Sequence, residues 1–569
     1  MKTTNLSKIR RDKMLDTISE IKKKINDENI LTNLSMIENE LTKKKYGLIW
    51  EEHEERVDTE LETQIPTFEE IKDKEILSDE CTKFNFLLEG DNLHSLYLLK
   101  KTHKEKIDVI YIDPPYNTGI NDFVYDDNMI GREDLFKHSK WLSFMNKRLS
   151  IAQSLLSNKG IIFISIDDNE QAQLKLLCDD IFGYNNCLGI LPTIMNLKGN
   201  QDQFGFAGTH EYTLVYAKNI SECSFGEFEV EEEEIEKQWS IDEIGYFKKG
   251  ANLKSTGVNA PRLKRPNLYF PIYVKVNEDN TINWDINYFE KSTEIFPITN
   301  NEEMSWRWSK TKFENEKHNV IVNFDFKSST VSFYKKQRPN LNDIPTKKPK
   351  SFFYKPEYSS GNGTNQLMKL FGNKVFNNPK PIELIKDFLR ISSTKNSIIL
   401  DFFAGSGTTG HAILELNKED NGNRKFILCT NNENEICEKI TYERLKMVIN
   451  GHNDVKGIPA NFKYYKTAYI PRVNTEKANL HNNLLINIKN LIQLENGIKI
   501  DDKQIKVYLD EKELDKFSVD KEALTECNKV YISSDILLTS EQEKTFEDNS
   551  IEVYIIPEYY FKNEILEVA

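Results

Sequence analysis

A carboxylate, two prolines and an aromatic ring follow one another at Asp113, Pro114, Pro115 and Tyr116. The carboxylate can accept a hydrogen bond from an amino group, and the ring offers a flat face for stacking. The prolines stiffen the turn, and we expect their carbonyl groups to remain as further acceptors. Together these groups suit the recognition of an exocyclic amine on a heterocyclic base. The alternative is an ordinary proline-rich turn in which the aspartate only favours the turn.

A glycine-rich loop contains Gly405, Gly407 and Gly410 and matches the pattern GxGxxG. Glycine lets a ligand approach the backbone closely, and the N-terminus of a following helix favours an anionic group. No lysine follows, so the loop is not that of an ATPase. S-Adenosylmethionine fits this loop as well as NAD does. Its carboxylate can bind at the N-terminus of the helix and accept hydrogen bonds from threonine hydroxyls. The acid expected for NAD about 20 residues later would be Glu419 or Asp420, which lie in a polar turn.

Both groups of residues follow segments that have the pattern of buried strands. Residues 107–113 and 397–403 are mostly apolar, and ligands bind at the carboxyl ends of strands in open α/β sheets. The other expected strands are 85–91, 160–167, 188–194, 211–216 and 425–430, and the expected helices include 92–102, 141–157, 381–391 and 434–449. This alternation predicts an α/β fold with a doubly wound sheet.

The overall composition describes a globular protein of several domains. The chain has 569 residues, of which 38% are apolar and 29% are charged. It contains no apolar run long enough to span a membrane and begins without an apolar signal segment. Its seven cysteines form no CxxC pair. We therefore expect a cytoplasmic protein with reduced thiols, no membrane span and no metal site.

A segment between the two halves of the α/β pattern differs in charge from the rest of the protein. The net charge is −14, yet residues 246–265 hold six basic residues and no acidic one. Residues 331–358 mix basic residues with aromatic ones, and Trp306-Arg307-Trp308 lies between the two windows. This mixture indicates a face that binds nucleic acid, the alternative being an ordinary mixed-charge surface. The candidate contacts are Lys248, Lys249, Arg262, Arg265, Lys335, Lys336, Arg338, Lys347, Lys348 and Lys350.

Three further segments complete the expected organisation. Residues 1–79 are predicted to form a helical arm for packing or dimerisation, with an apolar stripe at Leu15, Ile18, Ile21 and Ile25 and a loop at 64–67. The acidic run 222–236 is interpreted as a solvated linker. Residues 469–569 are predicted to form a small acidic α/β domain, with strands near 505–509, 529–533 and 551–556.

The order of the two motifs resembles the β-class amino-methyltransferases of DNA. In that family, the Asp-Pro-Pro-Tyr motif precedes a motif like Asp-Phe-Phe-Ala-Gly-Ser-Gly-Thr-Thr, which stands here at 401–409. The resemblance implies a permuted, Rossmann-like sheet with strand order 3-2-1-4-5-7-6, entered at strand 3 and completed by strands 1 and 2. It also implies two methyltransferase halves, at 80–219 and 373–468, that flank a target recognition domain at 220–372.

The resemblance assigns roles residue by residue. Asp113, Pro114, Pro115 and Tyr116 would guide methyl transfer to the exocyclic N6 amine of adenine in DNA. S-Adenosylmethionine would be the donor, and aspartate at the first position favours adenine over cytosine. The implied cofactor residues are Asp91, Pro379, Lys380, Asp401, Phe403, Ala404, Gly405, Ser406, Gly407, Thr408, Thr409 and Glu433, the last substituting for the usual acid after strand 2.

Three segments more specifically resemble the modification subunit of type III restriction–modification systems. They are Tyr46–Glu51, Glu89–Leu93 and Ser165–Glu170, together with the extra C-terminal domain. The resemblance implies double-stranded DNA as a partner, a homodimer and a separate restriction subunit, since the sequence carries no nuclease or helicase motif. Three alternatives remain: a stand-alone methyltransferase acting on DNA or RNA, a non-catalytic DNA-recognition subunit, and an NAD-dependent oxidoreductase.

Overall fold

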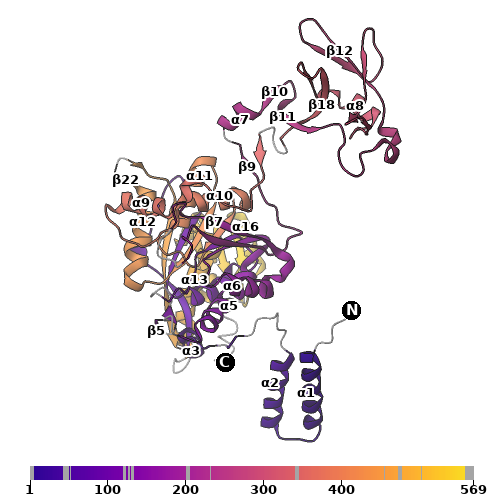
Figure 1. The fold of residues 1–569 in the computed structure, drawn as a ribbon. Helices are drawn as coiled ribbons and strands as arrows, with labels where there is room; N and C mark the ends of the chain where they lie inside the picture. Colours follow the sequence, from indigo (N-terminus) through magenta and orange to yellow (C-terminus); the bar gives the residue numbers. More distant parts are fainter. Residues whose placement is uncertain are drawn as a thin grey trace. The chain divides into compact units, whose positions relative to one another are not determined.

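The computed structural model describes residues 6–42, 50–51, 53–119, 124–125, 128–129, 134–199, 205–230, 232–339, 345–453, 455–471, 477–501, 503–557 and 560. The chain divides into two compact units (Figure 1). The larger one combines residues 1–225 with residues 350–569, and the smaller one consists of residues 226–349. The smaller unit falls inside the segment 220–372, whose bounds remain a prediction.

A nine-stranded sheet forms the centre of the larger unit, in the order β1-β24-β2-β21-β20-β3-β6-β8-β7. Its strands are β1 (Gln64–Glu70), β2 (Phe84–Glu89), β3 (Ile107–Ile112), β6 (Leu156–Ile166), β7 (Cys187–Ile194), β8 (His210–Ala217), β20 (Ile398–Asp401), β21 (Lys425–Thr430) and β24 (Asn461–Pro471). The strands from β24 to β6 are parallel, and β8 is antiparallel to both of its neighbours. From β2 to β7, the order is 3-2-1-4-5-7-6 in the expected numbering, so the predicted permuted fold is confirmed.

The permutation brings the two chemical motifs to the same edge of the sheet. Strands β20 and β21 follow the insert in the sequence but lie between β2 and β3 in the sheet. β20 pairs in parallel with β3 through Ile399 with Val109 and Leu400 with Ile110. The residues after Asp401 therefore leave the sheet beside the residues after Ile112, because parallel neighbours end at the same edge.

Helices cover both faces of the sheet. The chain moves along the sheet in one direction from β2 to β6 and in the opposite direction from β20 to β24. Right-handed crossovers therefore place the connecting helices on opposite faces. One group is α4 (Asn92–Thr102), α5 (Lys137–Leu155), α6 (Gln171–Cys178) and α13 (Lys477–Asn496), and the other is α9 (Ser360–Phe371), α10 (Ile382–Ser392), α11 (Thr408–Asp420) and α12 (Glu443–Asn450). Members of each group pack on one another.

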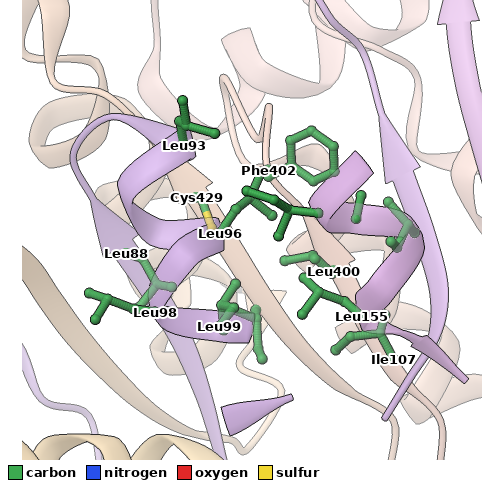
Figure 2. Close-up of a cluster of buried hydrophobic side chains, with 14 of the residues drawn as sticks. Leu88, Leu93, Leu96, Leu98, Leu99, Ile107, Leu155, Leu400, Phe402 and Cys429 are labelled. Atoms are coloured by element: carbon green, nitrogen blue, oxygen red, sulfur yellow. The ribbon is translucent and has the colours of Figure 1, made fainter. Parts of the chain in front are cut away.

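An apolar core between helices and sheet supports the edge that carries the motifs. Leu93, Leu96 and Leu99 recur every three residues on α4 and are fully buried, as expected for a helix with one apolar face. Figure 2 shows them in one cluster with Leu400 of β20 and Phe402, which follows that strand. The residues on either side of the glycine loop are thus held by packing.

The N-terminal segment differs from its prediction in two respects. The expected loop at 64–67 is wrong, because these residues belong to β1, which pairs antiparallel with β24. The sheet tolerates Pro66 in β1 because β1 is an edge strand. The hairpin of α1 (Leu6–Lys22) and α2 (Glu28–Thr42) precedes α3 (Arg56–Thr63), and the expected stripe is only partial, because Ile18 is buried but Ile21 is 38% exposed. Residues 46–49 of the segment Tyr46–Glu51 lie outside the described residues.

The smaller unit consists of short strands around its own aromatic core. Its elements are β9 (Phe228–Glu229), α7 (Glu232–Gln238), β10 (Ser240–Asp242), β11 (Gly245–Asn252), β12 (Ile272–Val276), β13 (Ile282–Asp285), β14 (Thr293–Ile295), β15 (Ile298–Thr299), β16 (Glu302–Glu303), α8 (Lys310–Asn315), β17 (Val320–Asp325), β18 (Thr330–Gln337) and β19 (Thr346–Lys347). The acidic run is therefore not only a linker, since α7 begins in it at Glu232. Trp306, Trp308, Phe313 and Phe333 are buried together in the core. The interpretation of Trp306, Trp308 and Phe333 as part of a nucleic-acid face is therefore wrong.

The C-terminal part of the larger unit contains the predicted small α/β arrangement. β25 (Ile505–Tyr508), β26 (Lys529–Ile532) and β27 (Glu552–Ile555) form a parallel sheet. Helices α14 (Glu511–Val519), α15 (Lys521–Glu526) and α16 (Ser540–Asp548) connect these strands. Elsewhere in the larger unit, β4 (Val124–Tyr125) pairs with β5 (Asn128–Met129), and β22 (Gly451–His452) pairs with β23 (Val455–Lys456). No helix in the described ranges is long and apolar enough to cross a membrane.

Candidate active site

The Asp-Pro-Pro-Tyr turn begins at the carboxyl end of β3, where Asp113 is the first residue after the strand. Trp141 of α5 is fully buried, and its Nε1 donates a 2.7 Å hydrogen bond to the Pro115 carbonyl. The expectation that both proline carbonyls stay free is therefore wrong for Pro115, because a buried indole N–H needs an acceptor. The Pro114 carbonyl accepts no hydrogen bond from the described residues and remains available.

A buried carboxylate holds the residue that follows the turn. Asn117 has a left-handed backbone with a φ of 57°, a conformation that asparagine tolerates better than most residues. Its Nδ2 donates a 2.5 Å hydrogen bond to Oε1 of Glu170, which lies 2.6 Å from Nδ1 of His138. Burial raises the pKa of Glu170, while Asn117 and His138 act in the opposite direction. Glu170, the last residue of the segment Ser165–Glu170 identified from the resemblance, therefore braces the Asp-Pro-Pro-Tyr turn.

Three charged side chains meet at the hydroxyl group of Tyr116. The Tyr116 oxygen lies 2.9 Å from Oδ1 of Asp113, 3.0 Å from Oε2 of Glu211 and 2.8 Å from Nζ of Lys380. Lys380 also forms an ion pair with Asp113 at 2.9 Å. Lys380 was expected to contact the cofactor, and its amine lies against the Asp113 carboxylate, because the segment before α10 passes that edge of the sheet. A contact of Lys380 with the cofactor remains a prediction.

Glu211 is a site residue that the sequence analysis missed. It is buried near the start of β8. Since β8 is antiparallel to β6, its first residues lie beside the last residues of β6, as the pairing of Tyr212 with Ile166 shows. An acid at the start of an antiparallel strand 7 therefore reaches the same edge as acids at the ends of the parallel strands. This position in the expected strand order was the signal that could have found it.

The cluster shifts the pKa of each member in a definite direction. Burial raises the pKa of Glu211, Lys380 opposes this shift and Asp113 adds to it. Burial alone would lower the pKa of Lys380, but the carboxylates of Asp113 and Glu211 outweigh it and raise that pKa. Burial and the two acids raise the pKa of Tyr116 well above its usual value, so its hydroxyl stays protonated.

The glycine loop is shaped by Asp401, the last residue of β20. Its Oδ1 accepts a 2.9 Å hydrogen bond from the Phe403 N–H, and its Oδ2 accepts one of 2.6 Å from the Thr409 hydroxyl. Burial raises the pKa of Asp401 to about 7, although both hydrogen bonds oppose the shift. Gly405 and Gly407 have left-handed backbones, with φ of 49° and 75°. Asp401 therefore organises the turn that the glycines make possible.

Thr441 packs against the other side of this loop. Its hydroxyl donates a 2.6 Å hydrogen bond to the Gly405 carbonyl, and a Cβ at Gly407 would lie 3.1 Å from its Cγ2. Gly407 therefore leaves room for the side chain of Thr441, and the expected close approach of a ligand to the loop remains a prediction. The Ala404 N–H donates to the Cys429 carbonyl at 3.1 Å, so the loop is also tied to β21.

A fully buried arginine supplies positive charge beneath the loop. Nη1 of Arg444 lies 3.1 Å from the Ser406 hydroxyl and 2.8 Å from that of Thr408. Of the threonine hydroxyls expected to donate to a carboxylate, that of Thr409 already donates to Asp401. That of Thr408 accepts from Arg444, so its donation to a carboxylate remains a prediction. The N-terminus of α11 has no side-chain cap at Gly407, and Nη2 of Arg444 has no hydrogen-bond partner in the described structure. Free N–H groups and buried positive charge fit the carboxylate of S-adenosylmethionine.

The remaining cofactor candidates lie near the same edge. Asp91 caps α4 by accepting a 2.7 Å hydrogen bond from the Leu93 N–H, and its Oδ1 lies 3.3 Å from Nη2 of the buried Arg148. Pro379 is buried directly before Lys380. Glu433 is exposed in a short turn after β21. Their contacts with a cofactor remain predictions.

A family described as DNA methylase (N6_N4_Mtase) matches residues 107–443, which run from β3 to the first residue of α12 and include both motifs. The chain belongs to this DNA methylase family. The resemblance inferred from the two motifs and their order is confirmed.

This methylase is similar to type III modification subunits and to a type II methyltransferase. It is 46% identical over 376 residues to the type III enzyme EcoPI Mod subunit of Escherichia phage P1, covering 61% of this chain and 58% of that protein. It is 33% identical over 389 residues to the type II methyltransferase M.KpnI of Klebsiella pneumoniae, covering 67% and 90%. The StyLTI Mod subunit of Salmonella typhimurium is 32% identical over 433 residues, covering 69% and 61%. The match thus spans less than two thirds of either Mod subunit.

Many basic residues of the methylase's insert are paired within the smaller unit. Lys336 and Arg338 both bind Asp242, at 2.6 and 2.8 Å. Further pairs are Arg262 with Glu303, Lys347 with Glu234, Lys248 with the ring of Trp239 and Lys249 with that of Tyr334. Because Lys336 and Arg338 are half-buried and ion-paired with Asp242, they are the weakest candidates for phosphate contacts. Arg265, Lys335, Lys348 and Lys350 are exposed, and their binding to DNA remains a prediction.

Proposed function

We propose that this methylase transfers the methyl group of S-adenosylmethionine to the exocyclic N6 amine of adenine in double-stranded DNA. The observation that carries the proposal is the parallel pairing of β3 with β20, since Asp113 and the glycine loop leave the same edge of the sheet. Membership of the DNA methylase family supports the reaction class. When bound, S-adenosylmethionine supplies an electrophilic methyl group on a positively charged sulfur.

The residues of the turn account for the orientation of the amine. The target adenine must leave the double helix to reach Asp113. The Asp113 carboxylate and the Pro114 carbonyl accept the two amine hydrogens, which turns the nitrogen lone pair toward the donor methyl group. The face of Tyr116 stacks on the base. Rate enhancement then comes from orientation and from the negative charge beside an amine that becomes cationic, so no strong base is needed.

The similarity to two Mod subunits supports a narrower role as the modification subunit of a type III system. Such a subunit would act in the cytoplasm as a homodimer together with a separate restriction subunit. The hairpin of α1 and α2 offers an apolar surface for the dimer, because Met14, Ile30, Met36 and Ile37 are between 43% and 62% exposed.

A stand-alone DNA methyltransferase is the second candidate. The observation in its favour is the match to M.KpnI, a type II methyltransferase, which covers 90% of that protein. Light scattering of the purified chain and co-purification with a co-expressed restriction subunit separate the two roles. A stable complex supports the type III assignment, and a fully active chain that binds no such subunit supports the second candidate.

The reaction itself is tested with purified protein, labelled S-adenosylmethionine and unmethylated DNA. We expect label in DNA, N6-methyladenine among the digested nucleosides, and one sequence motif when the modified DNA is read by single-molecule sequencing. Label on cytosine would contradict the base assignment, and label without sequence preference would contradict target recognition. A rise in melting temperature with NAD but not with S-adenosylmethionine would favour the oxidoreductase alternative.

A further inference from the structure

The catalytic carboxylate is one of two acids that share a single hydroxyl group. Oδ1 of Asp113 and Oε2 of Glu211 lie 2.9 and 3.0 Å from the Tyr116 oxygen, which carries only one hydrogen to donate. Lys380 lies 2.8 Å from the same oxygen and can only donate to it. The Tyr116 hydroxyl therefore accepts from Lys380 and donates to one of the two acids.

The two acids differ in access. The Asp113 side chain is 28% exposed, whereas those of Glu211 and Lys380 are 11% exposed. Lys380 bonds Oδ1 of Asp113, which leaves Oδ2 for an incoming amine. Oε1 of Glu211 is buried without a hydrogen-bond partner in the described part of the chain, so the Glu211 charge depends on Lys380. Asp113 thus faces the substrate, and Glu211 lies behind it.

The charges of the cluster depend on one another. Two neighbouring carboxylates with no cation share a proton, because like charges disfavour each other's ionisation. A protonated Asp113 would lose acceptor capacity and negative charge, which the proposed transfer needs. The Lys380 ammonium removes that repulsion, and two acids in turn keep a buried lysine charged.

We infer that Lys380 and Glu211 form a buried ion pair that fixes the position and the negative charge of the Asp113 carboxylate. Both are positioning residues, and the inference rests on the proposed methyl transfer. Lys380 holds Oδ1 so that Oδ2 faces the amine. Glu211 balances the ammonium, so that the cluster enters the reaction with one net negative charge against the positive charge that develops on the amine.

Two further titratable groups lie near Asp113, one on the strand before it and one on the neighbouring strand. Tyr111 of β3 is buried, which raises its pKa well above the usual value, so it stays neutral. Burial raises the pKa of Asp401 at the end of β20 to about 7, so it titrates in the range of interest. Since Asp401 is unchanged in every variant below, differences between the variants report on Lys380 and Glu211.

The experiment compares the wild type with Lys380→Met, Glu211→Gln and the double variant in single-turnover methylation from about pH 5 to 9. In Lys380→Met the two acids share a proton, so we expect at least about a tenfold loss near neutral pH that recovers as the pH rises. The double variant removes both partner charges, so the rate of this variant should fall only at low pH, where Asp113 itself is protonated. The double variant should therefore be faster than Lys380→Met below neutral pH. Lys529→Met, which removes an exposed ion pair of the same 2.9 Å length with Glu552, is the matched control and should match the wild type.

A merely structural role gives a different pattern. The double variant would then be at least as slow as Lys380→Met at every pH, and the profiles would keep the wild-type shape. Either result overturns the inference. Methyl transfer to DNA by the wild-type protein in the same experiment would still support the proposed function.

Thermal unfolding provides a readout that does not need activity. Because the shared proton raises the folded-state pKa of the two acids in Lys380→Met, that variant should lose stability relative to the wild type as the pH rises, and Glu211→Gln should suppress the loss. If the wild type transfers no methyl group to DNA, the proposed function fails, and this comparison alone decides whether the ion pair exists. Parallel melting curves for all variants would refute it.

Discussion

Replacing Glu170 with alanine tests whether the brace behind the catalytic turn sets the rate. The fully buried Glu170 carboxylate accepts from the Asn117 amide at 2.5 Å and lies 2.6 Å from the His138 ring nitrogen. A hydrogen bond to a charged group contributes about 1.5–3 kcal/mol, and the left-handed backbone at Asn117 costs on the order of 1 kcal/mol that this bond offsets. We therefore expect the active turn to be disfavoured by about 2 kcal/mol, or roughly 30-fold in population.

The assay is single-turnover methylation at saturating DNA and donor, with the binding of S-adenosylmethionine measured by calorimetry. Glu170→Ala should methylate about 30-fold more slowly with unchanged donor affinity, because the glycine loop is built by other residues. Glu170→Gln is the matched control, since its amide oxygen can still accept from Asn117, and it should lose much less. A Glu170→Ala rate within about threefold of the wild type, or equal losses in both variants, would refute the bracing role.

Three further predictions follow from the site and the insert. Asp113→Ala should reduce methylation by at least about 100-fold, the scale of one positioned electrostatic partner, while donor affinity measured by calorimetry is largely kept; methylation at the wild-type rate would remove Asp113 from catalysis. Gly407→Val should abolish S-adenosylmethionine binding with the circular dichroism spectrum retained, because the loop needs a left-handed residue and a Cβ there would press on Thr441; unchanged affinity would place the donor elsewhere. Neutralising the exposed Arg265, Lys335 and Lys348 should weaken DNA binding for all sequences and lower the slope against log salt by up to about 3, whereas neutralising the paired Lys336 and Arg338 should change the slope less; equal effects would contradict this distinction.

The sequence by itself determined the elements that carry the chemistry. Apolar, β-branched runs before Asp113 and Gly405 predicted β3 and β20, and the helix expected at 92–102 is α4 with the same bounds. These features depend on local patterns of a few residues, which set strand or helix preference and end a strand at a proline. The motif order then implied the permuted strand order, and with it the meeting of the catalytic turn and the glycine loop.

Composition could not distinguish a core from a binding face. Aromatic residues among basic ones predicted a nucleic-acid surface, yet Trp306 and Phe333 are buried in the smaller unit. The same aromatic residue can be buried in a core or exposed on a binding surface. Only the pairing of the strands around it decides which of the two environments it has. For the same reason, the sequence did not predict that the carboxylates of Asp242 and Glu303 neutralise basic residues that are distant from them in the sequence.

Only the tertiary structure decided which side chains complete the site. Glu211 reaches Asp113 because β8 runs antiparallel to β6, and Lys380 reaches it because the chain returns from the insert past the same sheet edge. Arg444 lies beneath the glycine loop through the packing of α12 on α11. No local pattern encodes these contacts, because each requires closure of a long stretch of chain, and the direction and neighbours of every strand settle where its end residues lie.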